Sequence, residues 1–191
     1  MNVRKQHVIK VAHQLFINKG FQATSIQDIL DESKISKGTF YNYFSSKNEL
    51  LIELFKTLFK QLRDERDKLL IGQDRSDIEI FIKQIELNLQ INRANKLISL
   101  FEEVYVSNDE DLKQFLKQGH IRVLNWVYNR FIDIFGEDKK PYLLDCAVML
   151  LGVLQSNLKY NALAYESHTS ISRVVRYSVN RIANIVEEVA K

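Results

Sequence analysis

The chain has 191 residues, of which 46% are hydrophobic and 27% are charged. It is therefore long enough for one or two domains with a hydrophobic core, and too apolar for a disordered chain. One proline and six glycines leave few chain breakers, which favours helices over a sandwich or barrel with many tight turns. The one cysteine, Cys146, excludes an intramolecular disulfide framework and a zinc site built on several cysteines, and it fits a reducing cytoplasm.

The net charge of +3 is too small to indicate a nucleic-acid partner by itself, but it is unevenly distributed. Residues 1–50 hold seven Lys or Arg against four Asp or Glu, whereas residues 51–191 hold twenty of each. The excess in the first quarter supports a DNA-binding role. The N-terminal segment carries charges throughout, unlike a secretory signal, and no window reaches the ~18 uninterrupted apolar residues of a membrane span. We expect a cytoplasmic protein.

Three short helices are predicted in the first fifty residues. Apolar residues at helical spacing predict a first helix that Gly20 stops. Ser25, followed three residues later by Asp28, has the pattern of a capping box and begins a second helix that ends near residue 33. Ser36 begins a third helix that runs to about Phe44.

Six longer helices are predicted in the rest of the chain. Three of them begin at a serine with a glutamate three residues later, namely Ser46 with Glu49, Ser76 with Glu79, and Ser107 with Glu110. Pro141 suits the first turn of the eighth helix, and Thr169 or Ser170 would cap the ninth. The expected spans are about 47–70, 76–91, 96–106, 107–136, 141–165 and 170 to near the C-terminus. The fold class predicted is all-α with about nine helices.

The third helix has an apolar side and a polar side. Phe40 and Phe44 are four positions apart and share one face of the helix. We expect that face to pack against Leu15, Ile26 and Ile29. The outward positions carry the side chains of Lys37, Thr39, Tyr41, Asn42 and Tyr43. Such groups can reach phosphate oxygens or base edges in a major groove, although a short aromatic helix can also be simple core.

Two further residues of this segment fit a contact with DNA. Gly38 lies in the first turn of the third helix, where it costs helix propensity but leaves room for another backbone to come close. Lys47, at the start of the fourth helix, could hold the DNA backbone from the flank. A second and third helix joined by a tight turn therefore predict a helix-turn-helix.

Residues 4–51 resemble the N-terminal domain of the TetR/AcrR family of transcriptional regulators. The matching features are LF and KGF in residues 15–21, TS at 24–25, DI at 28–29 and SKGTFYNYFSSKNELL at 36–51. The resemblance implies that the third helix enters the major groove. The DNA contacts it implies are Lys37, Gly38, Thr39, Tyr41, Asn42, Tyr43 and Lys47, with Thr24 and Ser25 binding phosphate at the start of the second helix.

Three positions depart from the family pattern. Lys34 stands in the turn where the family usually has glycine, so we expect a left-handed or otherwise adapted backbone there. Leu30 replaces a common alanine, which changes the packing between helices slightly. Asn42 stands where aromatic residues or histidine often occur, so the operator sequence cannot be read from the resemblance.

The resemblance beyond the fourth helix is architectural. It implies a helix-turn-helix domain at residues 1–47 and an effector-binding and dimerisation domain at 48–191. The last helix carries an apolar seam at alternating steps of four and three, and the eighth has small residues that allow close approach. The predicted dimer residues are Ala147, Gly152, Ser156, Ile171, Val175, Ser178, Ile182, Ile185 and Val189. The alternative is that both stripes face the subunit's own core.

A pocket for a small, largely apolar effector is expected among helices four to eight. Its predicted lining is Phe59, Leu62, Leu89, Phe101, Tyr105, Trp126, Arg130 and Met149, although aromatic residues at helical spacing are more often core. His120 and Cys146 are too isolated to predict a metal site, and the pair Glu102 and Glu103 is typical of a solvated face. We expect no cofactor, no metal and no catalytic activity.

The sequence thus predicts a homodimeric repressor that binds double-stranded DNA at a palindromic operator and that a small molecule releases. One alternative is a helical protein-interaction module that keeps the helix-turn-helix as a scaffold. Another is an activator or a DNA-binding protein that needs no effector. The effector, the operator and the regulated genes are not encoded in any pattern of this sequence.

Overall fold

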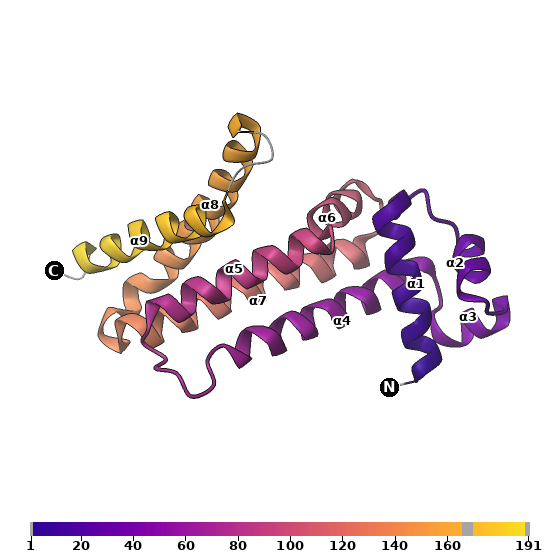
Figure 1. Cartoon of the computed structure of the whole chain (residues 1–191), viewed down its shortest axis with the longest axis horizontal. Helices are drawn as coiled ribbons and strands as arrows, with labels where there is room; N and C mark the ends of the chain where they lie inside the picture. The colour runs from indigo at the N-terminus through magenta and orange to yellow at the C-terminus, as the bar shows by residue number, and fades with distance from the viewer. Residues whose placement is uncertain (1, 166–169, 190–191) are drawn as a thin grey trace. The chain divides into compact units, whose positions relative to one another are not determined.

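The computed structural model describes residues 2–165 and 170–189. Over these residues the chain forms nine α-helices, one short 3-10 helix and no strand, which confirms the all-α prediction (Figure 1). The α-helices are α1 (Val3–Lys19), α2 (Ile26–Ser33), α3 (Lys37–Tyr43), α4 (Lys47–Lys68), α5 (Ile78–Ala94), α6 (Leu97–Val106), α7 (Glu110–Phe135), α8 (Lys140–Tyr165) and α9 (Ile171–Val189). The 3-10 helix is η1 (Glu137–Lys139).

The ends of the first three helices are set by the residues that the sequence indicated. Gly20 ends α1 with φ of 87°. The Ser25 side chain accepts from the backbone N–H of Asp28, whose carboxylate accepts from the backbone N–H of Ser25, so the capping box is confirmed. Lys34 follows α2 with φ of 56°, which confirms the left-handed backbone. The Ser36 side chain caps α3.

Two predicted serine caps are replaced by aspartates. Helices α5 and α7 begin later than Ser76 and Ser107, and the residues directly before them are Asp77 and Asp109. The carboxylates of these aspartates accept a backbone N–H of the first turn at 2.8 and 2.7 Å. The aspartates take the capping role because they lie directly before the helices, where their carboxylates reach N–H groups of the first turn.

The last two helices begin close to the predicted positions. Pro141 lies in the first turn of α8, where its missing N–H costs no hydrogen bond. The Ser170 hydroxyl accepts from the backbone N–H of Arg173, so Ser170 caps α9. Thr169, the other candidate for this cap, lies outside the described residues.

The chain divides into two compact units. The first comprises the residues up to Asp64 together with Asn92–Lys117, and the second comprises Glu65–Ile91 together with the residues from Gln118 onward. Helix α6 and the start of α7 thus belong with the N-terminal helices. The predicted domain boundary after residue 47 stays a prediction.

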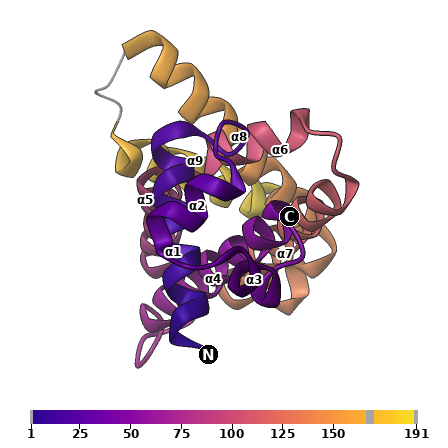
Figure 2. The same ribbon diagram turned by 90° about the vertical axis from the view of Figure 1, so that its right-hand side faces the viewer.

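The helices of the predicted helix-turn-helix pack against the core of the first unit. Phe40 and Phe44 are buried in one apolar cluster with Ile29, and Leu15 and Ile26 pack against it, as the spacing predicted. The same cluster includes residues of α4, α6 and α7. Figure 2 presents α1, α2 and α3 toward the viewer. Because α3 is anchored by its apolar side, its polar side is fixed in direction.

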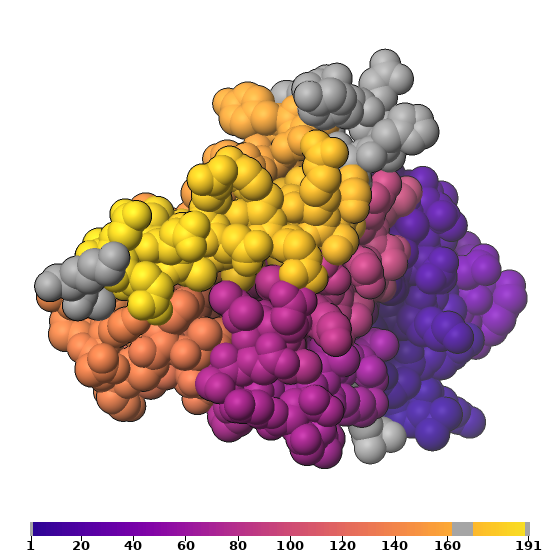
Figure 3. Space-filling model, turned by 60° about the vertical axis from the view of Figure 1, so that its left-hand side comes forward, coloured from indigo at the N-terminus to yellow at the C-terminus, as the bar shows by residue number. Residues whose placement is uncertain are grey.

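The core of the second unit is built on α5, α7, α8 and α9. Phe81 of α5 contacts Phe131 of α7, with ring centroids 5.5 Å apart. Helices α8 and α9 lie side by side (Figure 1). In Figure 3 the yellow surface of α9 borders the magenta surface of α5, where Arg176 forms a two-pronged ion pair with Glu79. These contacts join segments that are far apart in the sequence.

One described helical segment, Glu137–Asn161, is long and apolar enough to cross a membrane by length and composition alone. Its apolar side chains have two roles. Leu143, Ala147 and Leu150 are buried in the core of the second unit. Leu144 and Val148 are about half exposed, at 47% and 52%. The helix therefore serves the fold with one side and presents an apolar surface on the other.

Candidate nucleic-acid interface

Helix α3 exposes a polar side opposite its buried phenylalanine. Lys37 and Asn42 are exposed, and 46% of the Tyr41 surface is accessible. Phe40 is fully buried and meets the Tyr41 ring edge-on, with centroids 5.4 Å apart. An anchored aromatic core thus holds a cation, a phenol and an amide at the surface, which are the groups that contact phosphates and base edges.

The fold makes no demand for glycine at Gly38. A Cβ atom placed there would meet only the Ser36 hydroxyl, at 3.9 Å, which is ordinary contact. Its φ is not among the positive values of the chain. Glycine costs about 1 kcal/mol in a helix interior, so the fold gives no reason for it here, and close approach of DNA at Gly38 stays a prediction.

The turn between α1 and α2 is held by polar groups that the family resemblance assigns to DNA. Thr24 is buried, and its hydroxyl donates to the Gly20 carbonyl at 2.7 Å. The Lys47 ammonium donates to the carbonyls of Phe21 and Thr24, both at 2.8 Å, and lies 4.4 Å from the centre of the Phe21 ring. Burial lowers the pKa of Lys47, while the nearby Glu103 carboxylate opposes that shift. Both side chains therefore stabilise the turn.

Two other predicted contacts lie partly inside the unit. Tyr43 is half-buried and packs against the core, and its phenolic oxygen accepts from the Asn2 amide at 3.3 Å. The hydroxyls of Thr39 and Ser36 are 2.9 Å apart. Asn2, which also caps α1, was missed because its contact with the end of α3 spans 41 positions in the sequence.

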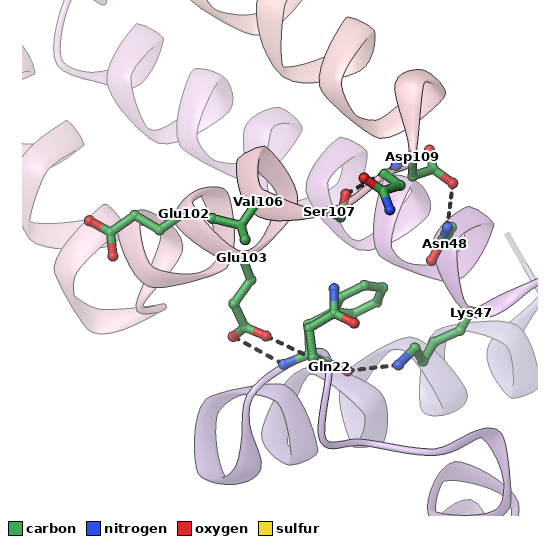
Figure 4. A pocket seen from close by; sticks show the side chains of 10 residues that line it. Gln22, Lys47, Asn48, Glu102, Glu103, Val106, Ser107 and Asp109 are labelled. Carbon is green, nitrogen blue, oxygen red and sulfur yellow. Dashed lines mark hydrogen bonds between the residues drawn. The ribbon is translucent and has the colours of Figure 1, made fainter.

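Glu103 of α6 binds the backbone of the same turn (Figure 4). The Glu103 carboxylate accepts from the backbone N–H of Phe21 at 3.1 Å and of Gln22 at 2.8 Å. Beside it, Asn48 at the start of α4 donates to Asp109, the cap of α7. The expectation of a solvated face for Glu103 is thereby corrected, because two backbone donors 81 and 82 positions away converge on it. The α1–α2 turn is thus tied to α4 and α6.

This geometry coincides with a known DNA-binding domain. Residues 8–54 match the sequence profile of the bacterial regulatory proteins of the tetR family. Residues 8–54 are a DNA-binding domain of the TetR family.

Relatives and solved structures agree with this assignment. The uncharacterized HTH-type transcriptional regulators YerO and YuxN of Bacillus subtilis are each 27% identical, over 100% and 83% of this chain. The chain spans 67% and 55% of the length of these two relatives. A crystal structure of a TetR-family transcriptional regulator from Mesorhizobium loti covers 95% of this chain and 96% of its own, with a TM-score of 0.73 and 18% identity. That likeness extends the fold of the TetR family over nearly the whole chain.

The predicted effector residues are divided between the two units. Phe59, Leu62, Phe101 and Tyr105 belong to the first, and Leu89, Trp126, Arg130 and Met149 to the second. Phe59 and Phe101 are packed with Phe55 as neighbouring rings of the core, with centroids 5.3 to 6.3 Å apart. Tyr105 and Met149 are 47% and 42% exposed. Within the second unit, Trp126 and Arg130 line one pocket, whose lining includes neither Leu89 nor Met149.

The predicted dimer seam lies largely inside one chain. Ala147, Val175, Ser178 and Ile182 are buried, and Ile171 and Ile185 pack against the same core. Gly152, Ser156 and Val189 are exposed. The apolar residues of α9 that repeat at steps of four and three therefore pack against the chain's own core, which is the alternative that the sequence left open. Four of the nine predicted dimer residues are buried and are unavailable to a partner while α9 stays packed on its own chain. Over the described residues, no group of three His, Cys, Asp or Glu is placed to hold a metal ion.

Proposed function

We propose that this TetR-family regulator is a homodimeric cytoplasmic repressor that binds a palindromic operator through α3 and leaves it when a small molecule binds. The observation that carries the DNA-binding part is the polar side of α3, where Lys37, Tyr41 and Asn42 are exposed on a helix anchored by Phe40. The fold itself uses none of these three side chains in its core. Their exposure supports a role toward a partner.

In this proposal the contacts have separate tasks. Lys37 binds a phosphate and contributes affinity that falls as salt rises. Tyr41 and Asn42 lie against base edges, and Gly38 lets the DNA backbone come close. Thr24 and Lys47 act as supports of the turn, because their polar atoms already bind carbonyls of the protein. The hydroxyl of Ser25 is likewise bound to Asp28.

A two-fold operator needs two copies of α3, so the proposal includes a homodimer. The exposed side of α8 supports this. Val148 and Met149 are 52% and 42% exposed, and Gly152 and Ser156 share their side of the helix. A Cβ atom at Gly152 would meet nothing within 4 Å, so the surface there is open to another helix. We expect Val148→Glu to give monomers in sedimentation experiments.

The experiment that tests DNA binding uses fragments selected from genomic DNA with the full-length protein, followed by fluorescence anisotropy at several salt concentrations. Lys37→Ala should reduce the slope of log K against log salt by about 0.9 for each phosphate that is no longer neutralised, hence by roughly two per dimer. Tyr41→Ala should weaken binding to the selected sequence more than to random DNA. Lys83→Ala, an exposed lysine on α5, is the control and should bind like the wild type.

Unchanged affinity in both variants would remove α3 from the interface and favour the protein-interaction alternative. Retention on a heparin column that weakens as salt rises would argue against that alternative. Repression and activation share the same DNA chemistry. They are separated by whether deletion of the gene raises or lowers transcription from the selected sites.

A further inference from the structure

The second unit holds a pocket of about 530 Å³ between the end of α4, the α4–α5 loop, α5 and α7. Its apolar walls are Leu70, Ile71 and the ring of Trp126. Its polar walls carry Asp67, Arg75, Gln84, Asn129, Arg130 and Asp133. A concave site with an apolar wall and a few converging polar groups is the usual form of a small-molecule site.

Arg130 is the unusual charged member of this set, because only 3% of its surface is exposed. Its Nε donates to Gln84 at 3.1 Å, and its Nη1 donates to the Arg75 carbonyl and to Asp133, both at 2.8 Å. Its Nη2 is also buried, and it meets no hydrogen-bond acceptor among the residues that the structure describes. A buried guanidinium nitrogen without an acceptor is costly, and a water, an ion or a ligand would supply the missing partner.

The charges around Arg130 leave an excess of positive charge. One oxygen of Asp133 serves two guanidinium groups, since Arg75 also donates to it at 2.8 Å. A third guanidinium, that of Arg66, lies 4.0 Å from the centre of the Trp126 ring. The other carboxylate, Asp67, is 64% exposed. Two guanidinium groups of the pocket lining, those of Arg75 and Arg130, thus share the Asp133 carboxylate, while the Asp67 carboxylate lies mostly in solvent.

We propose that this pocket binds a small organic carboxylate whose apolar part lies against Trp126. The carboxylate supplies the acceptor that Nη2 of Arg130 lacks and shares Arg75 with Asp133. The proposal rests on the proposed function, because it names the chemical class of the effector. It also sharpens the sequence-based expectation of a largely apolar effector by adding one negative charge.

Trp126 is the only tryptophan of the chain, so its fluorescence reports on this pocket alone. The first test compares quenching by iodide and by caesium ions in the full-length protein at constant ionic strength. An excess of positive charge should concentrate iodide, and we expect iodide to quench Trp126 at least about threefold more efficiently than it quenches the variant Arg130→Gln, with caesium quenching both weakly. Equal iodide quenching of both proteins would overturn the charge argument.

The second test uses benzoate and octanoate as probes and the neutral benzamide and octanamide as matched controls. We expect at least one carboxylate to shift Trp126 fluorescence and raise the melting temperature at a concentration at least about tenfold below its amide. Arg130→Lys keeps the positive charge but loses the forked donors, so it should lose most of this preference. Arg93→Gln, an exposed arginine near the end of α5, should keep it. Carboxylates and amides that act alike, or an unchanged preference in Arg130→Lys, would overturn the proposal.

These tests contain no DNA, so their failure leaves the DNA-binding proposal standing. Adding the bound carboxylate to the protein–DNA complex then tests release. Loss of DNA binding supports the effector role. Unchanged DNA binding with the carboxylate bound would keep the pocket assignment and refute release by this class of ligand.

Discussion

On α3 the polar side chains of Lys37, Tyr41 and Asn42 face solvent, whereas on α7 the guanidinium of Arg130 is buried and held by three hydrogen bonds. The caps that fix α3 and its neighbour α2 reach only three residues along the chain. The bonds to Gln84 and to the Arg75 carbonyl span 46 and 55 positions. The surface proposed to meet DNA is thus shaped by local rules, and the pocket is shaped by tertiary contacts.

The largest loss of stability is expected when the contacts of Gln84 with residues distant in the sequence are removed. Gln84 is 1% exposed, accepts from Arg130 and donates to the Arg66 carbonyl at 3.0 Å. Gln84→Ala leaves a buried charged donor unsatisfied and removes one of the two hydrogen bonds to the Arg66 carbonyl, which also accepts from the backbone N–H of Leu69. It should therefore lower the free energy of unfolding by about 3 kcal/mol. Urea unfolding followed by Trp126 fluorescence measures this in the second unit. Gln90→Ala, an exposed glutamine on the same helix, is the control. Equal stability of the two variants would contradict the distinction between local and distant contacts.

A smaller loss of stability is expected when the contact of Glu103 with the α1–α2 turn is removed. Glu103→Ala removes the acceptor of two backbone N–H groups, and water can hydrogen-bond only one of them in its place. The substitution should therefore lower the free energy of unfolding by about 2 kcal/mol. The neighbouring Glu102→Ala is a matched control, because Glu102 is exposed and on the same helix. Hydrogen exchange of the N–H groups of Phe21 and Gln22 is the most direct measurement. Protection of these N–H groups from exchange that survives in Glu103→Ala would show that Glu103 is not needed to hold the turn.

The local capping box should have a still smaller and pH-dependent effect. Ser25→Ala should destabilise the first unit by about 1 kcal/mol at neutral pH. The backbone N–H of Ser25, aided by Lys19, lowers the pKa of Asp28 to about 2. A depressed pKa gives stability that is complete above the unfolded value near 4 and is lost as the pH falls toward 2. Thermal unfolding between pH 5 and pH 2 should therefore be flatter for Asp28→Asn than for the wild type, and an equally steep fall would contradict the capping role.

The smallest change in stability and the clearest separation from function are expected at Gly38. Gly38→Ala adds a methyl group in open space, so it should leave the protein as stable or stabilise it by up to about 1 kcal/mol. Binding to the selected DNA should nevertheless weaken by at least about tenfold, because the methyl group meets the duplex. Thermal unfolding and fluorescence anisotropy on the same sample measure both effects. Full DNA affinity in a stable variant would exclude close approach at this position.

The local features of the first fifty residues could be predicted because each depends on a few neighbouring positions. The Ser25 and Asp28 box, the Gly20 stop and the left-handed Lys34 all follow from backbone rules of one turn. The all-α fold followed from the same helical spacing repeated along the chain. Exposure of Lys37, Tyr41 and Asn42 followed from the opposite placement of Phe40.

Assignments that depended on distant contacts could not be made from the sequence. The charge of Lys47 predicts a DNA contact, which stays a prediction, but its two carbonyl partners, 23 and 26 positions away, could not be predicted from the sequence. The seam on α9 has the same pattern whether it meets α8 of its own chain or of another. Arg130 was placed in the pocket, yet its partners Gln84, Arg75 and Asp133 carry no shared motif.

The left-handed backbone of Lys34, in the turn before α3, affects which substitutions the protein can accept there. A non-glycine residue at φ of 56° costs the folded state about 1 kcal/mol, but it also restricts the unfolded chain, and the two effects partly offset. The lysine therefore has a narrower range of backbone angles in this turn than glycine would have. Exchange of Lys34 for glycine would be nearly neutral for folding and would widen the range of backbone angles between α2 and α3. Under the proposed function, a change at this one exposed position would therefore alter how strictly related operators are told apart without altering how well the protein folds.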